Sequence, residues 1–195
     1  LSAIYLAAVK DRLYCDRPDS LRRRGTQRTL YVITDALCRL LAPIMPHTAD
    51  EAFLSLRGQG GAGQACVHLE AFAVLPALSG LKPRERYQAL LEVRHHALQA
   101  MEHARKTLGV ENPLDMGVTL PNRDGALDGF VELDLADLLG VSRVRFDPGL
   151  SEARVADLRS EPRCERSWRR DGTVRPRAEH AGAMLCERCA EALRR

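Results

Sequence analysis

Near the start of the chain, apolar residues recur at three- and four-residue spacing, which is the period of an amphipathic helix. Residues 1–15 form the first such run, and the proline-containing stretch 17–20 interrupts it. A second run covers residues 21–42 and ends at Pro43 and Pro46, because proline cannot continue a helix. The predicted buried faces consist of Tyr5, Val9 and Leu13 in the first run and of Leu30, Ile33, Leu37, Leu40 and Leu41 in the second.

A third helix is predicted to begin at Thr48, because Thr48 and Glu51 have the spacing of a capping box. The glycine-rich stretch 58–63 lacks the Gly-Lys-Ser/Thr ending of a phosphate-binding loop, so its composition favours a solvated linker. Residues 67–75 are predicted to run extended across the helices. Helices joined by short breaks indicate a mainly α bundle over residues 1–80.

After residue 80 the pattern mixes helix and strand. A long helix is predicted over residues 83–108, with Pro83 at its first position and Gly109 as its stop. A strand, a short helix and a second strand are predicted at 116–120, 133–139 and 141–146, which indicates a small α/β module over residues 81–147. Residues 148–162 are predicted to be a linker with one short strand near Val155. The predicted buried stripe of the long helix is Tyr87, Leu91, Leu98, Met101 and Leu108.

The last segment, residues 163–195, has the cysteine spacing of a zinc-ribbon-like end. Cys186 and Cys189 form a C-x-x-C turn, Cys164 lies in an earlier turn, and Ser167 stands where a fourth sulfur is expected. Structural zinc takes four tetrahedral ligands, mostly thiolates and imidazoles, so these three cysteines are the predicted zinc ligands. For the fourth position, His180, Ser167 and water remain open, and a ribbon held by packing without metal is a further alternative.

Positive charge is concentrated in the same segment. Residues 163–195 contain nine arginines against five acidic residues, a net charge of +4, whereas the whole chain carries +3. A tryptophan in a basic segment offers a stacking surface for an unstacked base, and arginine can pair with a base edge or a phosphate. We therefore predict RNA contacts by Arg166, Trp168, Arg169 and Arg170, with a role of Trp168 as the anchor of a small core as the alternative.

Several familiar motifs are missing from the sequence. It contains no nucleophile elbow, P-loop, H-E-x-x-H motif or dinucleotide-binding fingerprint, so no catalytic residue is predicted in this chain. It also contains no run of 18 apolar residues and no signal peptide at its start. The chain opens at Leu1 inside a helical pattern, which suggests a fragment of a longer polypeptide. Cys15, Cys38 and Cys66 are expected to be reduced core or surface thiols.

Several stretches, in the right order over nearly the whole chain, resemble bacterial isoleucyl-tRNA synthetases. They are Lys10–Asp16 (KDRLYCD), Leu40–Pro46 (LLAPIMP), His47–Ala52 (HTADEA), Val67–Glu70 (VHLE) and the two cysteine turns, C-x-R-S-W and L-C-x-R-C. The resemblance implies a helical anticodon-binding domain, a small α/β junction and the zinc-ribbon-like end. It places Arg166 and Trp168 against the anticodon loop.

The resemblance also implies what surrounds this chain. The catalytic domain with the HIGH and KMSKS motifs, the ATP it binds, and the editing domain would belong to the rest of the polypeptide. The expected partner is isoleucine tRNA, and the expected protein is a cytoplasmic monomer that does not bind membranes. A stand-alone zinc-ribbon adaptor for nucleic acid or protein, and the equivalent region of a valyl or leucyl enzyme, are the alternatives.

Overall fold

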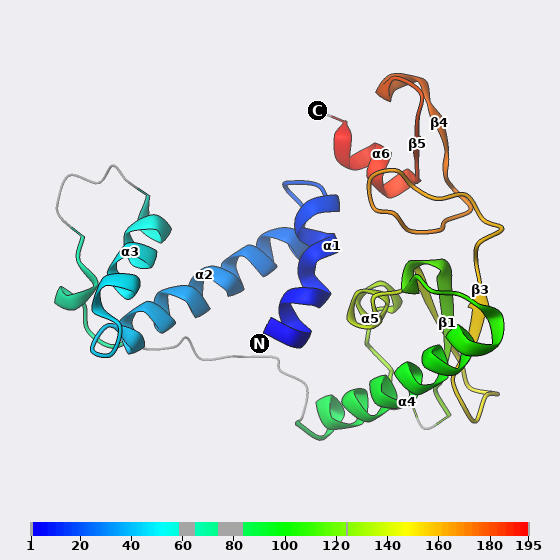
Figure 1. Ribbon diagram of the computed structural model, residues 1–195, viewed down its shortest axis with the longest axis horizontal. Coiled ribbons are helices and arrows are strands. Elements are labelled where there is room, and N and C mark those ends of the chain that lie inside the picture. The colour runs from blue at the N-terminus through cyan, green and yellow to red at the C-terminus, as the bar shows by residue number, and fades with distance from the viewer. Residues whose placement is uncertain (1, 59–64, 74–83, 124, 195) are drawn as a thin grey trace. The chain divides into compact units, whose positions relative to one another are not determined.

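The computed structural model describes the chain except for residues 1, 59–64, 74–83, 124 and 195. It divides into two compact units, Leu21–Leu81 and a second unit made of Leu1–Ser20 with Lys82–Arg195 (Figure 1). The mainly α architecture with a cysteine-rich end is confirmed. Residues 1–20 pack with the later part of the chain, whereas the sequence pattern grouped them with the helices that follow them.

The unit Leu21–Leu81 is built on two helices, α2 (Leu21–Leu41) and α3 (Pro46–Arg57), followed by a 3-10 turn, η2 (Val67–Leu69). The Phe53 side chain is fully buried at its centre. The Val67 backbone N–H donates to the Asp50 carboxylate (2.9 Å), which fastens η2 to α3. The buried residues of this unit's core are Cys38, Ala42, Ala49, Phe53 and Val67.

Three predictions for this unit were wrong. Helix α3 begins at Pro46, ahead of the predicted capping box at Thr48, because proline suits the first helical position. Residues 67–69 form a 3-10 turn and are not extended. The α2 face that is buried contains Ala36 and Cys38, whereas Leu37, Leu40 and Leu41 are exposed. Gly58 ends α3 with a φ of 78°. The predicted linker at 59–63 and the end of the predicted extended segment, residues 74–75, lie outside the described residues.

The second unit begins with a π-helical turn, η1 (Ser2–Leu6), that leads into α1 (Ala7–Cys15). After residue 83 come α4 (Arg84–Leu108), the turn η3 (Pro113–Asp115) and strand β1 (Met116–Pro121). The chain continues with α5 (Glu132–Leu139), β2 (Arg143–Asp147) and β3 (Arg154–Asp157). These elements match the predicted helix–strand–helix–strand order, and β3 is the short strand predicted near Val155.

The three strands form one sheet in the order β2-β1-β3. Strand β1 pairs in parallel with β2, with Val118 opposite Val144, and antiparallel with β3, with Val118 opposite Val155. Helix α5 connects the parallel strands, and Gly140 ends it in the left-handed conformation (φ 71°), which glycine adopts at little cost.

Helices α4 and α5 share the core of this sheet. On α4 the buried residues are Ala97, Met101 and Ala104, whereas Tyr87, Leu91 and Leu108 of the predicted stripe are exposed. Small alanines allow α4 to approach the sheet closely, and the larger side chains lie at the edge of that contact. The core cluster is Ala97, Met101, Val110, Met116, Val118, Leu120, Leu127, Leu135, Ala136, Leu139, Val141 and Val144.

The chain ends in a small β-hairpin and helix that belong to the same unit (Figure 1). Strands β4 (Arg175–Arg177) and β5 (Ala183–Leu185) pair antiparallel, with the turn η4 (Ala178–His180) between them. Helix α6 (Glu187–Leu193) follows directly. Among the described residues, no helix is long and apolar enough to cross a membrane.

Candidate metal centre and nucleic-acid surface

Three of the predicted metal ligands come together in the structure. The sulfur atoms of Cys164, Cys186 and Cys189 lie within 4.8 Å of one another, and all three side chains are buried. Cys186 occupies the N-cap position of α6 and Cys189 lies one turn later, so the C-x-x-C spacing places both thiols at the same helix end. This group could hold a metal ion.

A fourth cysteine belongs to the same buried cluster. Cys15, at the end of α1, packs in this cluster with Cys164, Cys186 and Cys189, although its sulfur is not among the three that all lie within 4.8 Å of one another. Hydrogen bonds from Cys15, Cys164 and Cys186 lower the pKa of Cys189, because three donors surround that sulfur. A thiolate is the form that binds a metal. Cys15 is thus a free, buried thiol, as predicted, and it packs in the same cluster as the three cysteines.

The predicted candidates for the fourth ligand, Ser167 and His180, are not part of the group of three close cysteines. The Ser167 side chain is buried, and its hydroxyl has no hydrogen-bond partner in the structure. The His180 Nε2 lies 3.2 Å from the carbonyl oxygen of Ala190. Over the described part of the chain, the metal-ligand group contains the three cysteines without a histidine.

The first cysteine turn fixes the position of Trp168. The Trp168 N–H donates to the Cys164 carbonyl (2.8 Å), and the Cys164 N–H donates to the Arg169 carbonyl (2.9 Å). These bonds hold Trp168 in the left-handed region with a φ of 63°, which is unfavourable for a bulky residue. Trp168 is 59% exposed, whereas Cys164, Ser167 and Arg169 of the same turn are buried. The backbone therefore presents this ring to the outside of the turn.

Arg166 joins this turn to α1. Its guanidinium donates to the carbonyl oxygens of Tyr14 (2.7 Å) and Cys15 (2.5 Å). In return, the Cys15 thiol lies 3.8 Å from the Arg166 carbonyl oxygen. These carbonyls are at the C-terminal end of α1, where a cation is favourable because the last helical carbonyls have no partner within the helix.

Arg169 and Arg170 are engaged in internal ion pairs. The buried Arg169 guanidinium pairs with Asp137 of α5 and lies 3.5 Å from Asp11 of α1. Arg170 pairs with Asp115 (2.7 Å), and Arg163 pairs with the same carboxylate (2.8 Å). Much of the positive charge of the C-terminal segment is thus neutralised within the fold, so Arg169 and Arg170 are less available to RNA than the sequence suggested.

A cavity of about 400 Å³ opens where α1, α5 and the first cysteine turn meet. Trp168 and Arg166 line it together with Lys10 and Tyr14 from α1. Tyr14 is 74% exposed. Two exposed aromatic rings therefore border one depression together with the cations Lys10 and Arg166, while the third cation, Arg169, is paired with the lining carboxylates Asp11 and Asp137. Aromatic faces stack on bases and cations attract phosphates, a combination that suits a nucleotide. We call this depression the Trp168 cavity.

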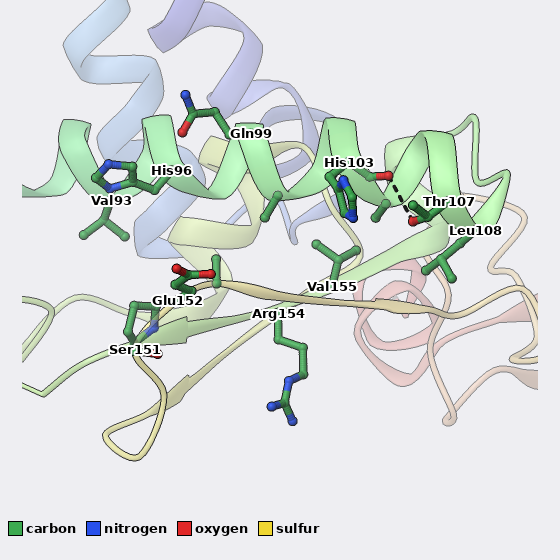
Figure 2. A pocket seen from close by; sticks show the side chains of 14 residues that line it. Val93, His96, Gln99, His103, Thr107, Leu108, Ser151, Glu152, Arg154 and Val155 are labelled. Carbon is green, nitrogen blue, oxygen red and sulfur yellow. Dashed lines mark hydrogen bonds between the residues drawn. The ribbon is translucent and has the colours of Figure 1, made fainter.

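A larger cavity, of about 670 Å³, lies between α4 and β3 (Figure 2). His96 and His103 of α4 border it, and Arg154 of β3 points away from it. None of the predicted site residues lines it. The two histidines are exposed, as expected for a solvated helix face.

The chain was compared with known protein families and curated proteins. Residues 1–120 match the family described as the anticodon-binding domain of tRNA ligase. The chain belongs to this family. The matched residues include α2 of the first unit and α1 of the second, so both compact units contribute to them.

Curated relatives extend the similarity to the C-terminal segment. Isoleucine–tRNA ligases of Brachyspira hyodysenteriae and Fervidobacterium nodosum are 34% and 33% identical to this chain over its whole length. That of Syntrophotalea carbinolica is 34% identical over 99% of the chain. The chain spans 22% of the length of each of these relatives and matches their C-terminal region. The chain therefore combines an anticodon-binding domain with a C-terminal cysteine-rich segment, and its curated relatives match both parts.

Sequence reasoning missed three residues of α1 at the site. Lys10 and Tyr14 are one helical turn apart, and that spacing puts them on the same face of α1. Their position in the Lys10–Asp16 stretch was a signal, but the sequence could not show that α1 lies against the C-terminal segment. Cys15 carried no signal of its own, because its partners are more than 140 residues away.

Proposed function

We propose that this chain is the anticodon-binding C-terminal part of an isoleucine–tRNA ligase and that it binds the anticodon stem-loop of isoleucine tRNA. The observation that carries this proposal is the match of the whole chain to the C-terminal region of isoleucine–tRNA ligases. The remainder of such a protein would attach isoleucine to the tRNA at the expense of ATP. The match over the full length gives less support to a stand-alone adaptor, and the names of the relatives give less to a valyl or leucyl enzyme.

In this proposal Trp168 stacks on an unpaired base of the anticodon loop. Its ring is exposed, the strained turn holds it in place, and Tyr14 offers a second aromatic face at the same cavity. Lys10 provides a cation for the phosphates, while Arg166 supports the turn from α1. Arg169 and Arg170 contribute indirectly, because their ion pairs with Asp137 and Asp115 hold the turn against α5 and η3.

Zinc is the proposed metal of the cysteine group. Thiolates select soft or borderline ions, and closed sites with four ligands from short cysteine turns are typical of structural zinc. When bound, zinc would supply folding free energy and would perform no chemistry on RNA. The buried thiols of Cys164, Cys186 and Cys189 would hold it, and the turn that carries Trp168 would keep its shape as a result.

The test is fluorescence anisotropy with labelled stem-loops that carry isoleucine or valine anticodons. We expect tighter binding of the isoleucine stem-loop, with an affinity that falls as salt rises, because phosphate contacts release counterions. Trp168→Ala should weaken binding by about tenfold or more, since one stacked base contributes about 1–3 kcal/mol. Val131→Ala, another exposed apolar side chain in the same unit, is the matched control. Equal binding of both stem-loops would overturn the isoleucine assignment, and no effect of Trp168→Ala would overturn the site.

A further inference from the structure

Ser167 and Cys15 are the two candidates for the fourth ligand of the cysteine group, and their contacts differ. The Ser167 hydroxyl occupies the sequence position of the expected ligand, yet it is buried without a hydrogen-bond partner, a sulfur included. The Cys15 thiol comes from a distant helix and packs in the same buried cluster as the three cysteines, outside the group of sulfurs that all lie within 4.8 Å of one another. Packing therefore favours the cysteine that the local spacing did not single out.

Chemistry favours the same residue. Zinc in proteins is bound by thiolates, imidazoles and carboxylates, whereas a serine hydroxyl keeps its proton near neutral pH and is a weak ligand. With Cys15, four sulfur atoms from three separate segments would complete the all-cysteine ligand set of a closed structural site. The segments are the end of α1, the first cysteine turn and the start of α6.

The surroundings of Cys15 fix its position. The Arg166 guanidinium holds the Tyr14 and Cys15 carbonyls, and the Arg188 guanidinium, next to Cys189, pairs with Asp11 and Asp16 on both sides of Cys15. Both cysteine turns are therefore fastened to the end of α1 independently of any metal. A thiol held in this way needs little reorganisation to become a ligand.

We propose that Cys15 is the fourth ligand of a zinc site with Cys164, Cys186 and Cys189, and that it takes the place left by Ser167. The metal then joins α1, in the part of the chain that matches the anticodon-binding family, to the C-terminal segment beyond it. This ligation presupposes the zinc proposed above but not RNA binding. Its readouts use the metal alone, so it can fail while the stem-loop still binds, and the reverse also holds.

The experiment counts sulfur ligands in the purified 195-residue chain, prepared without chelator. Metal analysis should give one zinc per chain, and zinc X-ray absorption should give four sulfur neighbours at about 2.3 Å. In Cys15→Ala we expect three sulfur neighbours and one lighter atom. Zinc affinity, measured by competition with a chromophoric chelator, should fall by more than about 100-fold, which exceeds the roughly 10- to 100-fold effect of a residue that only supports a ligand.

Two further variants keep the result interpretable if Cys15→Ala folds poorly. Cys66→Ala removes a thiol of the other compact unit and should leave four sulfur neighbours. Ser167→Cys combined with Cys15→Ala should restore four sulfur neighbours and the affinity for zinc. Three outcomes would overturn the proposal: a wild-type chain without zinc, a wild-type site with three sulfurs that Cys15→Ala does not change, or a fall in affinity that stays within the range of a supporting residue while four sulfurs remain.

Discussion

Arg188 and Asp11 form a bidentate ion pair although they are 177 positions apart in the sequence. Both terminal guanidinium nitrogens of Arg188 donate to the two carboxylate oxygens of Asp11, and Arg188 also reaches Asp16 at 3.0 Å. The pair joins α6, which carries Cys189, to α1, which carries Cys15. The same contact thus brings together the elements that the metal site and the Trp168 cavity require.

Removing one partner of this pair should destabilise the second compact unit. Burial opposes ionisation of Asp11, but the hydrogen bond from Arg188 and the charges of Arg169 and Arg188 outweigh it, so the pKa of Asp11 is lowered. Asp11→Asn or Arg188→Met should each cost about 3 kcal/mol, because each leaves a partly buried charge unpaired. The double variant should cost less than the sum, which urea unfolding of all four proteins would measure. Strict additivity would show that the pair contributes no coupling.

Trp168→Gly should separate folding from RNA binding. Glycine adopts a φ of 63° without the strain that the tryptophan carries, so the melting temperature should stay equal or rise. Loss of the ring should nevertheless weaken stem-loop binding by about tenfold or more. Thermal melting and anisotropy on the same sample give both quantities. A glycine variant that binds as well as the wild type would exclude stacking on Trp168.

Arg166→Ala distinguishes support from direct recognition. Loss of two charge-assisted hydrogen bonds to α1 carbonyls should lower the free energy of unfolding by about 1–3 kcal/mol. Arg175→Ala, at an exposed arginine of β4, should be nearly neutral. If Arg166→Ala melts like the wild type but binds the stem-loop poorly, its guanidinium contacts RNA directly.

Stability should fall in acid partly through Asp115. Burial opposes ionisation of this carboxylate, yet hydrogen bonds from Arg163 and Arg170 prevail and lower its pKa. A carboxylate with a lowered pKa in the folded state stabilises the fold above its unfolded pKa of about 3.9, and this stabilisation disappears as the pH falls through the folded value. The free energy of unfolding should therefore drop below about pH 4.

Asp115→Asn tests this assignment by urea unfolding at pH 7 and pH 3. The variant should be less stable than the wild type at pH 7 and should lose less stability on acidification. Glu111→Gln, at an exposed carboxylate nearby in sequence, should retain the wild-type pH dependence. An unchanged pH dependence in Asp115→Asn would assign the acid sensitivity to other carboxylates.

The sequence by itself determined the order of helices and strands as far as β3, the three tail cysteines and the family. Local periodicity, proline and glycine positions and short cysteine spacings carry that information, because they depend on neighbours within a few residues. The faces of α2 and α4 were less predictable. Small residues such as Ala97 and Ala104 are buried because elements approach closely there, while larger leucines remain at the edges.

Only the tertiary structure decided which residues share the site. In the structure α1 packs with the C-terminal segment and not with the helices that follow it in sequence. Cys15 therefore lies in the same cluster as Cys189, and Tyr14 lines the Trp168 cavity. It also showed that Arg169 and Arg170 meet Asp137 and Asp115 inside the fold. Charge counts along a sequence cannot reveal such pairing, because the partners of each arginine are set by long-range packing and not by spacing.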